Sequence, residues 1–139
     1  MLYALWLLLG LVLGSALLFF ARRFRKGRAE KHVLGNALII AAMIYIGFAM
    51  LWGNGIWVGI EIVGVLFYWG FARAAIRHSV YWLAVGWALH PVWDVGLHLL
   101  GAGNAIAPQW YAVACISFDL LVAGYVLARA GEWKKKLFV

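Results

Sequence analysis

Five apolar stretches, separated by short polar or glycine-rich segments, dominate the chain. A membrane-spanning helix needs about 20 mainly apolar residues, and each stretch meets or approaches that length. The predicted spans are 2–20, 33–52, 56–72, 80–100 and 110–128. The pattern therefore predicts an all-α polytopic membrane protein with five transmembrane helices, forming one domain over residues 1–139.

Composition supports the membrane class. Of the 139 residues, 67% are hydrophobic and 12% are charged, whereas a soluble domain is nearer half apolar and a quarter charged. No charged segment is long enough to form a soluble domain of its own. The lone cysteine excludes an internal disulfide.

The basic residues predict an orientation. All twelve Lys and Arg fall in the first linker, the third linker and the C-terminal tail. With five spans these segments lie on one side, which the positive-inside rule makes cytoplasmic. We therefore expect a multi-pass protein of the cell (inner) membrane, with the N-terminus outside and the C-terminus cytoplasmic. The basic residues are Arg22, Arg23, Arg25, Lys26, Arg28, Lys31, Arg73, Arg77, Arg129, Lys134, Lys135 and Lys136.

This charge favours membrane partners. We expect the basic segments to contact anionic lipid headgroups at the cytoplasmic face of the bilayer, and we expect no nucleic acid partner. Glu30 and Glu132 fall in the same segments and need no special explanation there. Trp133, near a span end, is typical of an aromatic anchor at the interface.

The first span contains the small-residue motif Gly10-x-x-x-Gly14, which lets two helices approach closely. The motif would suit contact with a second copy or with another subunit of a membrane complex. Packing inside one bundle is the favoured interpretation, because such motifs are common in membrane helices.

The fourth span holds three ionisable residues on one helix face. His90, Asp94 and His98 stand at i, i+4 and i+8, within an arc of about 80°. An ionisable group at membrane depth is costly, so it usually faces the protein interior and marks function. Pro91 is expected to kink this helix and to free the carbonyl group of Trp87.

The third and fifth spans bring further polar groups to a similar depth. Glu61 and Asp119 each lie inside a span, and Cys115 stands one turn before Asp119 on the same face. Carboxylates at one depth are buried at lower cost together with histidines than separately. We therefore predict an outward-opening polar site on the third to fifth spans, with Trp87 and Trp93 also lining it.

Metal binding is the leading interpretation of this site. A His and a carboxylate at i, i+4 are about 6 Å apart and can hold one ion, whereas His90 and His98 are about 12 Å apart. The predicted ligands are His90, Asp94, His98 and Glu61, with Asp119 or Cys115 able to complete a shell. Two ions with Asp94 between them form a second arrangement.

Such ligands suit a divalent metal: zinc, iron or copper. A metal-bound water is a nucleophile near neutral pH, so the leading activity is a hydrolase or oxidoreductase acting on a lipid-like substrate. Asp94 and Asp119 are the catalytic candidates. Two alternatives use the same residues. One is a proton or cation pathway, and the other is a non-catalytic structural or assembly subunit that uses them as interhelical contacts.

The sequences GWALHPVWDVGLHLL and WYAVACISFDLLVAGYVLAR resemble a family of small bacterial integral membrane proteins of unknown function. That family has a helix with the pattern W-x-x-H-x-x-W-D-x-x-x-H, an outer loop with proline, and a span carrying A-C-x-x-x-D. The resemblance covers about the last 60 residues and supplies no reaction. It implies one shared site made of His90, Trp93, Asp94, His98, Cys115 and Asp119.

Overall fold

The computed structural model describes the backbone of residues 1–24 and 27–135. Arg25, Lys26 and Lys136 of the basic segments lie outside the described residues. These described residues form five α-helices and one π-helical turn. In order these are α1 (Leu2–Arg23), α2 (Gly27–Trp52), α3 (Gly55–Arg77), α4 (Tyr81–Asp94), η1 (Val95–Leu99) and α5 (Gln109–Lys135).

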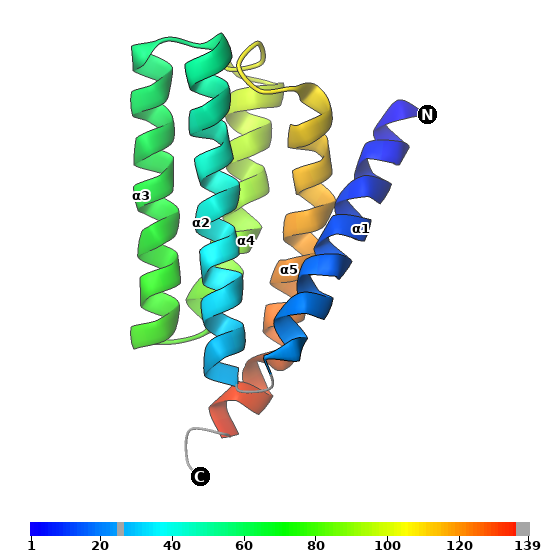
Figure 1. Ribbon diagram of the computed structural model, residues 1–139, viewed down its shortest axis with the longest axis vertical. Coiled ribbons are helices and arrows are strands. Elements are labelled where there is room, and N and C mark those ends of the chain that lie inside the picture. The colour runs from blue at the N-terminus through cyan, green and yellow to red at the C-terminus, as the bar shows by residue number, and fades with distance from the viewer. Residues whose placement is uncertain (25–26, 136–139) are drawn as a thin grey trace.

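The helices form an elongated bundle (Figure 1). Helices α2 to α5 stand side by side, while α1 leans across α5 and its N-terminal end diverges from the rest. The Gly10-x-x-x-Gly14 motif explains the contact between α1 and α5. A Cβ atom at Gly10 would lie 2.0 Å from the Ala114 carbonyl oxygen, and one at Gly14 would lie 3.1 Å from Leu121 Cδ2. The motif therefore packs inside the bundle, as favoured from the sequence.

Four helices, α1, α2, α3 and α5, are long and apolar enough to cross a membrane. Their outward faces carry many large exposed apolar side chains, such as Leu8, Val12 and Leu66. In water such surfaces would aggregate, whereas lipid solvates them. The membrane character predicted from the sequence is therefore retained in the fold.

The fourth predicted span divides into two parts. Helix α4 has 14 residues and continues directly into the five-residue π turn η1. The α-helix passes through Pro91, and the departure from α-helical geometry comes one turn later, where Leu100 N donates to Val95 O. The interruption of the α-helix that was expected at Pro91 therefore occurs in η1, nearer the loop that follows Leu99. π turns are frequent at functional sites because they reposition side chains.

The segment Gly53-Asn54-Gly55 separates α2 from α3. Asn54 is the N-cap of α3, and its side-chain oxygen accepts hydrogen bonds from the backbone N–H groups of Ile56 and Trp57. This cap satisfies two of the backbone donors that every helix leaves free at its start.

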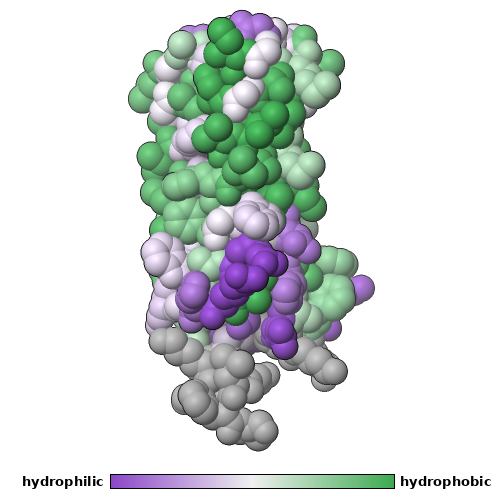
Figure 2. All heavy atoms as spheres, turned by 90° about the vertical axis from the view of Figure 1, so that its left-hand side faces the viewer, coloured by the Kyte–Doolittle hydropathy of each residue, from purple (hydrophilic) through white to green (hydrophobic). Residues whose placement is uncertain are grey.

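The described basic residues gather at one end of the bundle, because the end of α1, the start of α2, the α3–α4 connection and the end of α5 all lie there (Figure 1). Figure 2 shows hydrophilic residues at this end, below a long hydrophobic surface. We call it the basic end.

Glu30 and Trp133 differ from expectation at this end. Glu30 is 1% exposed and Trp133 is 3% exposed. The Trp133 indole N–H donates to Glu30 Oε2 at 3.0 Å, and Tyr125 and Arg129 also donate to this carboxylate. Glu30 is therefore a buried contact between α2 and α5, and Trp133 is one of its partners instead of a surface anchor.

Candidate functional site

The buried face of α4 meets α5 at three ionisable side chains, His90, Asp94 and Asp119. Each is at most 1% exposed. Asp119 Oδ2 accepts a hydrogen bond from His90 Nδ1 at 2.9 Å. Asp94 Oδ2 lies 3.4 Å from the same nitrogen. His90 and Asp94 meet because they are one turn apart, whereas Asp119 reaches them only through the packing of α5.

The three residues could hold a metal ion. One ligand atom from each lies within 4.8 Å of the others. Asp119 Oδ1 is buried without a hydrogen-bond partner, and the buried Asp94 carboxylate lies beside the Tyr45 hydroxyl group and the Cys115 thiol without a well-aligned hydrogen bond. Buried carboxylate oxygens normally have partners, because an unpaired charge in an apolar interior is costly. We call this group, His90, Asp94 and Asp119, the triad.

His98 and Glu61 form a separate buried pair, between η1 and α3. His98 Nε2 lies 3.1 Å from Glu61 Oε1, without the alignment of a hydrogen bond. The opposite ring nitrogen, Nδ1, contacts the Gly103 carbonyl oxygen at 3.2 Å. A carbonyl oxygen only accepts, so Nδ1 carries a proton. An ion pair with Glu61 therefore requires His98 to be doubly protonated.

The predicted ligands thus divide into two groups. His90 and Asp94 join Asp119 in the triad, while His98 and Glu61 lie outside that set and pair with each other. His98 lies within the π turn, which changes its direction relative to a straight α-helix. Helical spacing alone could not reveal this division.

The two predicted tryptophans have different surroundings. Trp93 donates to Glu61 Oε2 at 3.4 Å and packs against Gly64, where a Cβ atom would lie 3.0 Å from the indole ring. Trp87 is fully buried, its ring centroid is 5.7 Å from that of Phe118, and its indole nitrogen has no hydrogen-bond partner. Trp93 therefore belongs to the His98–Glu61 pair, and Trp87 packs between α4 and α5.

Two tyrosines that the sequence analysis did not single out complete the site. Tyr45, on α2, stacks on His98 with ring centroids 4.5 Å apart and lies 6.1 Å from the His90 ring. Tyr68, on α3, lies 4.9 Å from the His90 ring and donates to the Leu89 carbonyl. Both are 1% exposed. The only sequence signal was a phenol inside an apolar span, which is common in membrane helices.

Cys115 connects the triad to an apolar groove. Cys115 is 7% exposed, and its thiol interacts with both Asp94 and the Tyr111 hydroxyl group. The groove, which we call the lateral groove, has a volume of about 490 Å³ and lies between α1, α2 and α5. Its lining consists of Gly10, Leu13, Leu17, Ala37, Ile40, Ala41, Ile44, Trp110, Tyr111, Ala114, Cys115 and Phe118. Helix α1 diverges from α2 toward its N-terminal end (Figure 1).

The residues of the triad and of the His98–Glu61 pair all lie within the part of the chain that matches a known family model, residues 6–132. The chain belongs to the family of unknown function DUF6010. Membership of a family of unknown function agrees with the resemblance seen in the sequence. No curated protein and no solved structure matches the chain. Function must therefore be argued from the site itself.

Proposed function

We propose that this chain is a multi-pass protein of the inner membrane that binds a divalent metal ion at the triad and acts there on an apolar substrate dissolved in the bilayer. The basic end would face the cytoplasm, by the positive-inside rule. The triad and the His98–Glu61 pair would then lie in the outer half of the membrane.

The observation that carries the proposal is the pair of buried carboxylates, Asp94 and Asp119, each of which brings a ligand atom within 4.8 Å of one imidazole. When His90 is neutral, the two ionised carboxylates leave a net charge of −2, and a metal ion bound at Nδ1 would replace the proton there. At membrane depth this charge is unfavourable unless it is neutralised. A divalent cation would neutralise it, and one imidazole with two carboxylates suits zinc or iron.

The surroundings support an apolar substrate. A metal ion bound at the triad would polarise a carbonyl or phosphoryl oxygen and would activate a water molecule. The lateral groove reaches the site at Cys115 and Tyr111, and its lining is otherwise apolar. A hydrocarbon chain could therefore enter from the membrane without exposing the triad to bulk water. Hydrolysis of a lipid-like molecule is the reaction class that combines these features.

Metal binding is the decisive test. Protein purified in neutral detergent without chelator would be dialysed against Zn²⁺ and analysed for bound metal. We expect about one ion per wild-type chain and at least tenfold weaker binding in Asp119→Asn and Asp94→Asn. Glu61→Gln is the matched control, because it removes a buried carboxylate of the neighbouring pair and should retain the ion.

Two results would overturn the proposal. One is the absence of stoichiometric metal in folded wild-type protein. The other is equal loss of metal in Glu61→Gln and Asp119→Asn. If, in addition, the variants lowered only folding yield, the structural or assembly role would remain.

The proton or cation pathway has one supporting observation, since Tyr45 lies between the rings of His98 and His90. Toward the basic end, however, the buried side chains are apolar, including Leu38, Leu83 and Val122. Among the described residues, the next buried ionisable group is Glu30, whose partner Trp133 stands about 21 Å along α5 from Asp119. This apolar layer favours a closed site over a path across the membrane.

A further inference from the structure

Two adjoining hollows at the basic end lie apart from the triad and meet at His78. The first, which we call the basic pocket, has a volume of about 260 Å³ and lies where α2, the α3–α4 turn and α5 meet. It is lined by Lys31, Ala75, Ile76, Arg77, His78, Ser79, Val80 and Trp133. Three of these side chains are basic and one carries a hydroxyl group.

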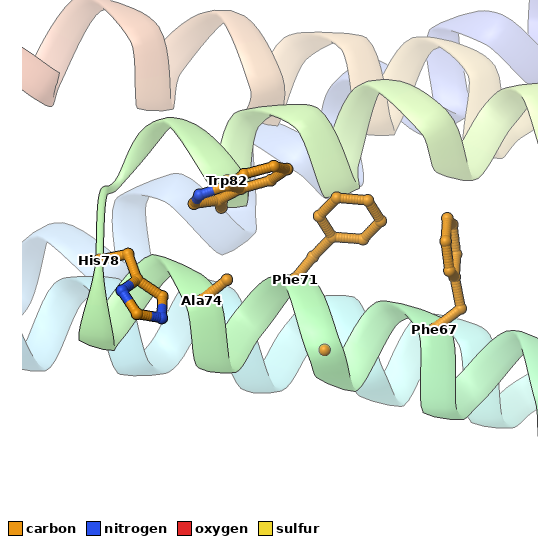
Figure 3. Close-up of a pocket in the computed structure, with 6 residues that line it drawn as sticks. Phe67, Phe71, Ala74, His78 and Trp82 are labelled. Carbon is orange, nitrogen blue, oxygen red and sulfur yellow. The ribbon is translucent and has the colours of Figure 1, made fainter.

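The second hollow, which we call the aromatic groove, runs between α3 and α4 and has a volume of about 490 Å³. It is lined by Phe67, Gly70, Phe71, Ala74, His78 and Trp82. Figure 3 shows Phe71 and Trp82 beside each other, Phe67 further along α3, and His78 at the α3–α4 turn. From His78 to Phe67 the groove extends about 16 Å along the helix, close to half the thickness of the hydrocarbon core.

The basic pocket has an excess of positive charge. Within the described part of the chain, no carboxylate lines it and no ion pair involves Lys31 or Arg77. Two acidic residues, Glu30 and Glu132, adjoin lining residues in sequence, and both are engaged elsewhere. Glu30 accepts from Tyr125, Arg129 and Trp133, and Glu132 accepts from Arg129. The positive charges of the pocket are therefore available to an external anion.

We infer that the basic pocket and the aromatic groove together bind one anionic phospholipid, with the phosphate group beside Lys31, Arg77 and His78 and an acyl chain along the aromatic groove. A charged pocket that opens directly into an apolar groove matches the two ends of an amphiphile. The length of the aromatic groove is close to the thickness of the hydrocarbon layer of one membrane leaflet. The inference does not depend on the proposed metal site, because the two share no residue.

Native mass spectrometry of the full chain in neutral detergent tests the headgroup contact. The probes are dioleoylphosphatidylglycerol and the zwitterionic dioleoylphosphatidylcholine, and we expect at least tenfold tighter binding of the former. Arg77→Gln should weaken the binding of phosphatidylglycerol about fivefold, which is the usual contribution of one cation near an anionic headgroup. Arg73→Gln is the control, because Arg73 lies over the Trp69 ring on the same helix and does not line the pocket.

A second pair of variants tests the groove. Gly70 and Gly59 both lie on α3 with no atom within 4 Å of an added Cβ, but only Gly70 lines the groove. Gly70→Phe should fill the aromatic groove and weaken the binding of phosphatidylglycerol at least fivefold. Gly59→Phe should leave the binding of this lipid unchanged. Both substitutions project into open space, so the fold should persist, and circular dichroism would verify this.

Glycerol phosphate, which carries the phosphate group without acyl chains, distinguishes a site for a phospholipid from a site for a free phosphate compound. We expect it to bind at least tenfold more weakly than the lipid. If glycerol phosphate and phosphatidylglycerol bound equally tightly, the site would be one for a free phosphate compound, and the lipid inference would be wrong. Equal binding of the two phospholipids, or equal effects of Arg73→Gln and Arg77→Gln, would also overturn the inference.

Discussion

The buried Glu30 carboxylate joins α2 to α5 and provides a sharp test of the packing at the basic end. It accepts from Tyr125 on Oε1, and from Trp133 at 3.0 Å and Arg129 at 3.4 Å on Oε2. Its side chain is 2% exposed. Glu30→Ala would leave these donors without their acceptor in a water-poor environment. Glu132 is the natural comparison, because it also pairs with Arg129 but is 58% exposed.

The expected magnitudes follow from burial. Removing one partner of a buried ion pair costs about 3–5 kcal/mol, whereas an exposed pair is worth about 0–1 kcal/mol. Arg129 is 24% exposed, so solvent would partly compensate for its lost partner. We therefore expect Glu30→Ala to lower the free energy of unfolding by about 3 kcal/mol and Glu132→Ala by less than about 1 kcal/mol. The loss of unfolding free energy in Glu30→Gln should lie between these two values, because the amide oxygen of Gln still accepts hydrogen bonds.

Reversible unfolding by sodium dodecyl sulfate in mixed micelles, followed by tryptophan fluorescence and circular dichroism, would measure these differences. The unfolded chain places residue 30 at the micelle surface, so the reference state is hydrated. A difference below about 0.5 kcal/mol between Glu30→Ala and Glu132→Ala would refute the assignment of Glu30 as a buried interhelical contact, since surface changes away from such contacts fall within that range.

Three further predictions concern the same unfolding assay. Gly10→Leu should destabilise the protein by about 1–3 kcal/mol through overpacking against the Ala114 backbone, whereas Gly47→Leu, with open space around it, should not; equal effects would contradict the α1–α5 contact. Asn54→Ala should cost about 1 kcal/mol by removing the α3 cap, and an unchanged midpoint would show the cap to be dispensable. Tyr45→Leu should be clearly destabilising through loss of stacking on His98, whereas Tyr45→Phe, which keeps the ring, should cost less; the reverse order would refute the stacking role.

The sequence alone determined the features that depend on local chemistry. Apolar length defined four helices that are long and apolar enough to cross a membrane, and the Asn54 cap marks the start of α3 at Gly55. The i, i+4 spacing placed His90 beside Asp94, because helical geometry makes such residues neighbours whatever surrounds them. The grouping of the basic residues at one end followed from the alternation of spans and linkers.

Tertiary structure decided which of these groups meet. Asp119, and not Glu61, joins His90 because α5 packs beside α4, while the π turn directs His98 to Glu61. Glu30 is buried because α5 extends past its predicted end at residue 128 and carries Trp133 to it. Each of these contacts joins segments far apart in sequence, and each depends on the rotation and length of a packed helix. Periodicity specifies the apolar face of a helix, but the packing of its neighbours specifies the partner of each polar group.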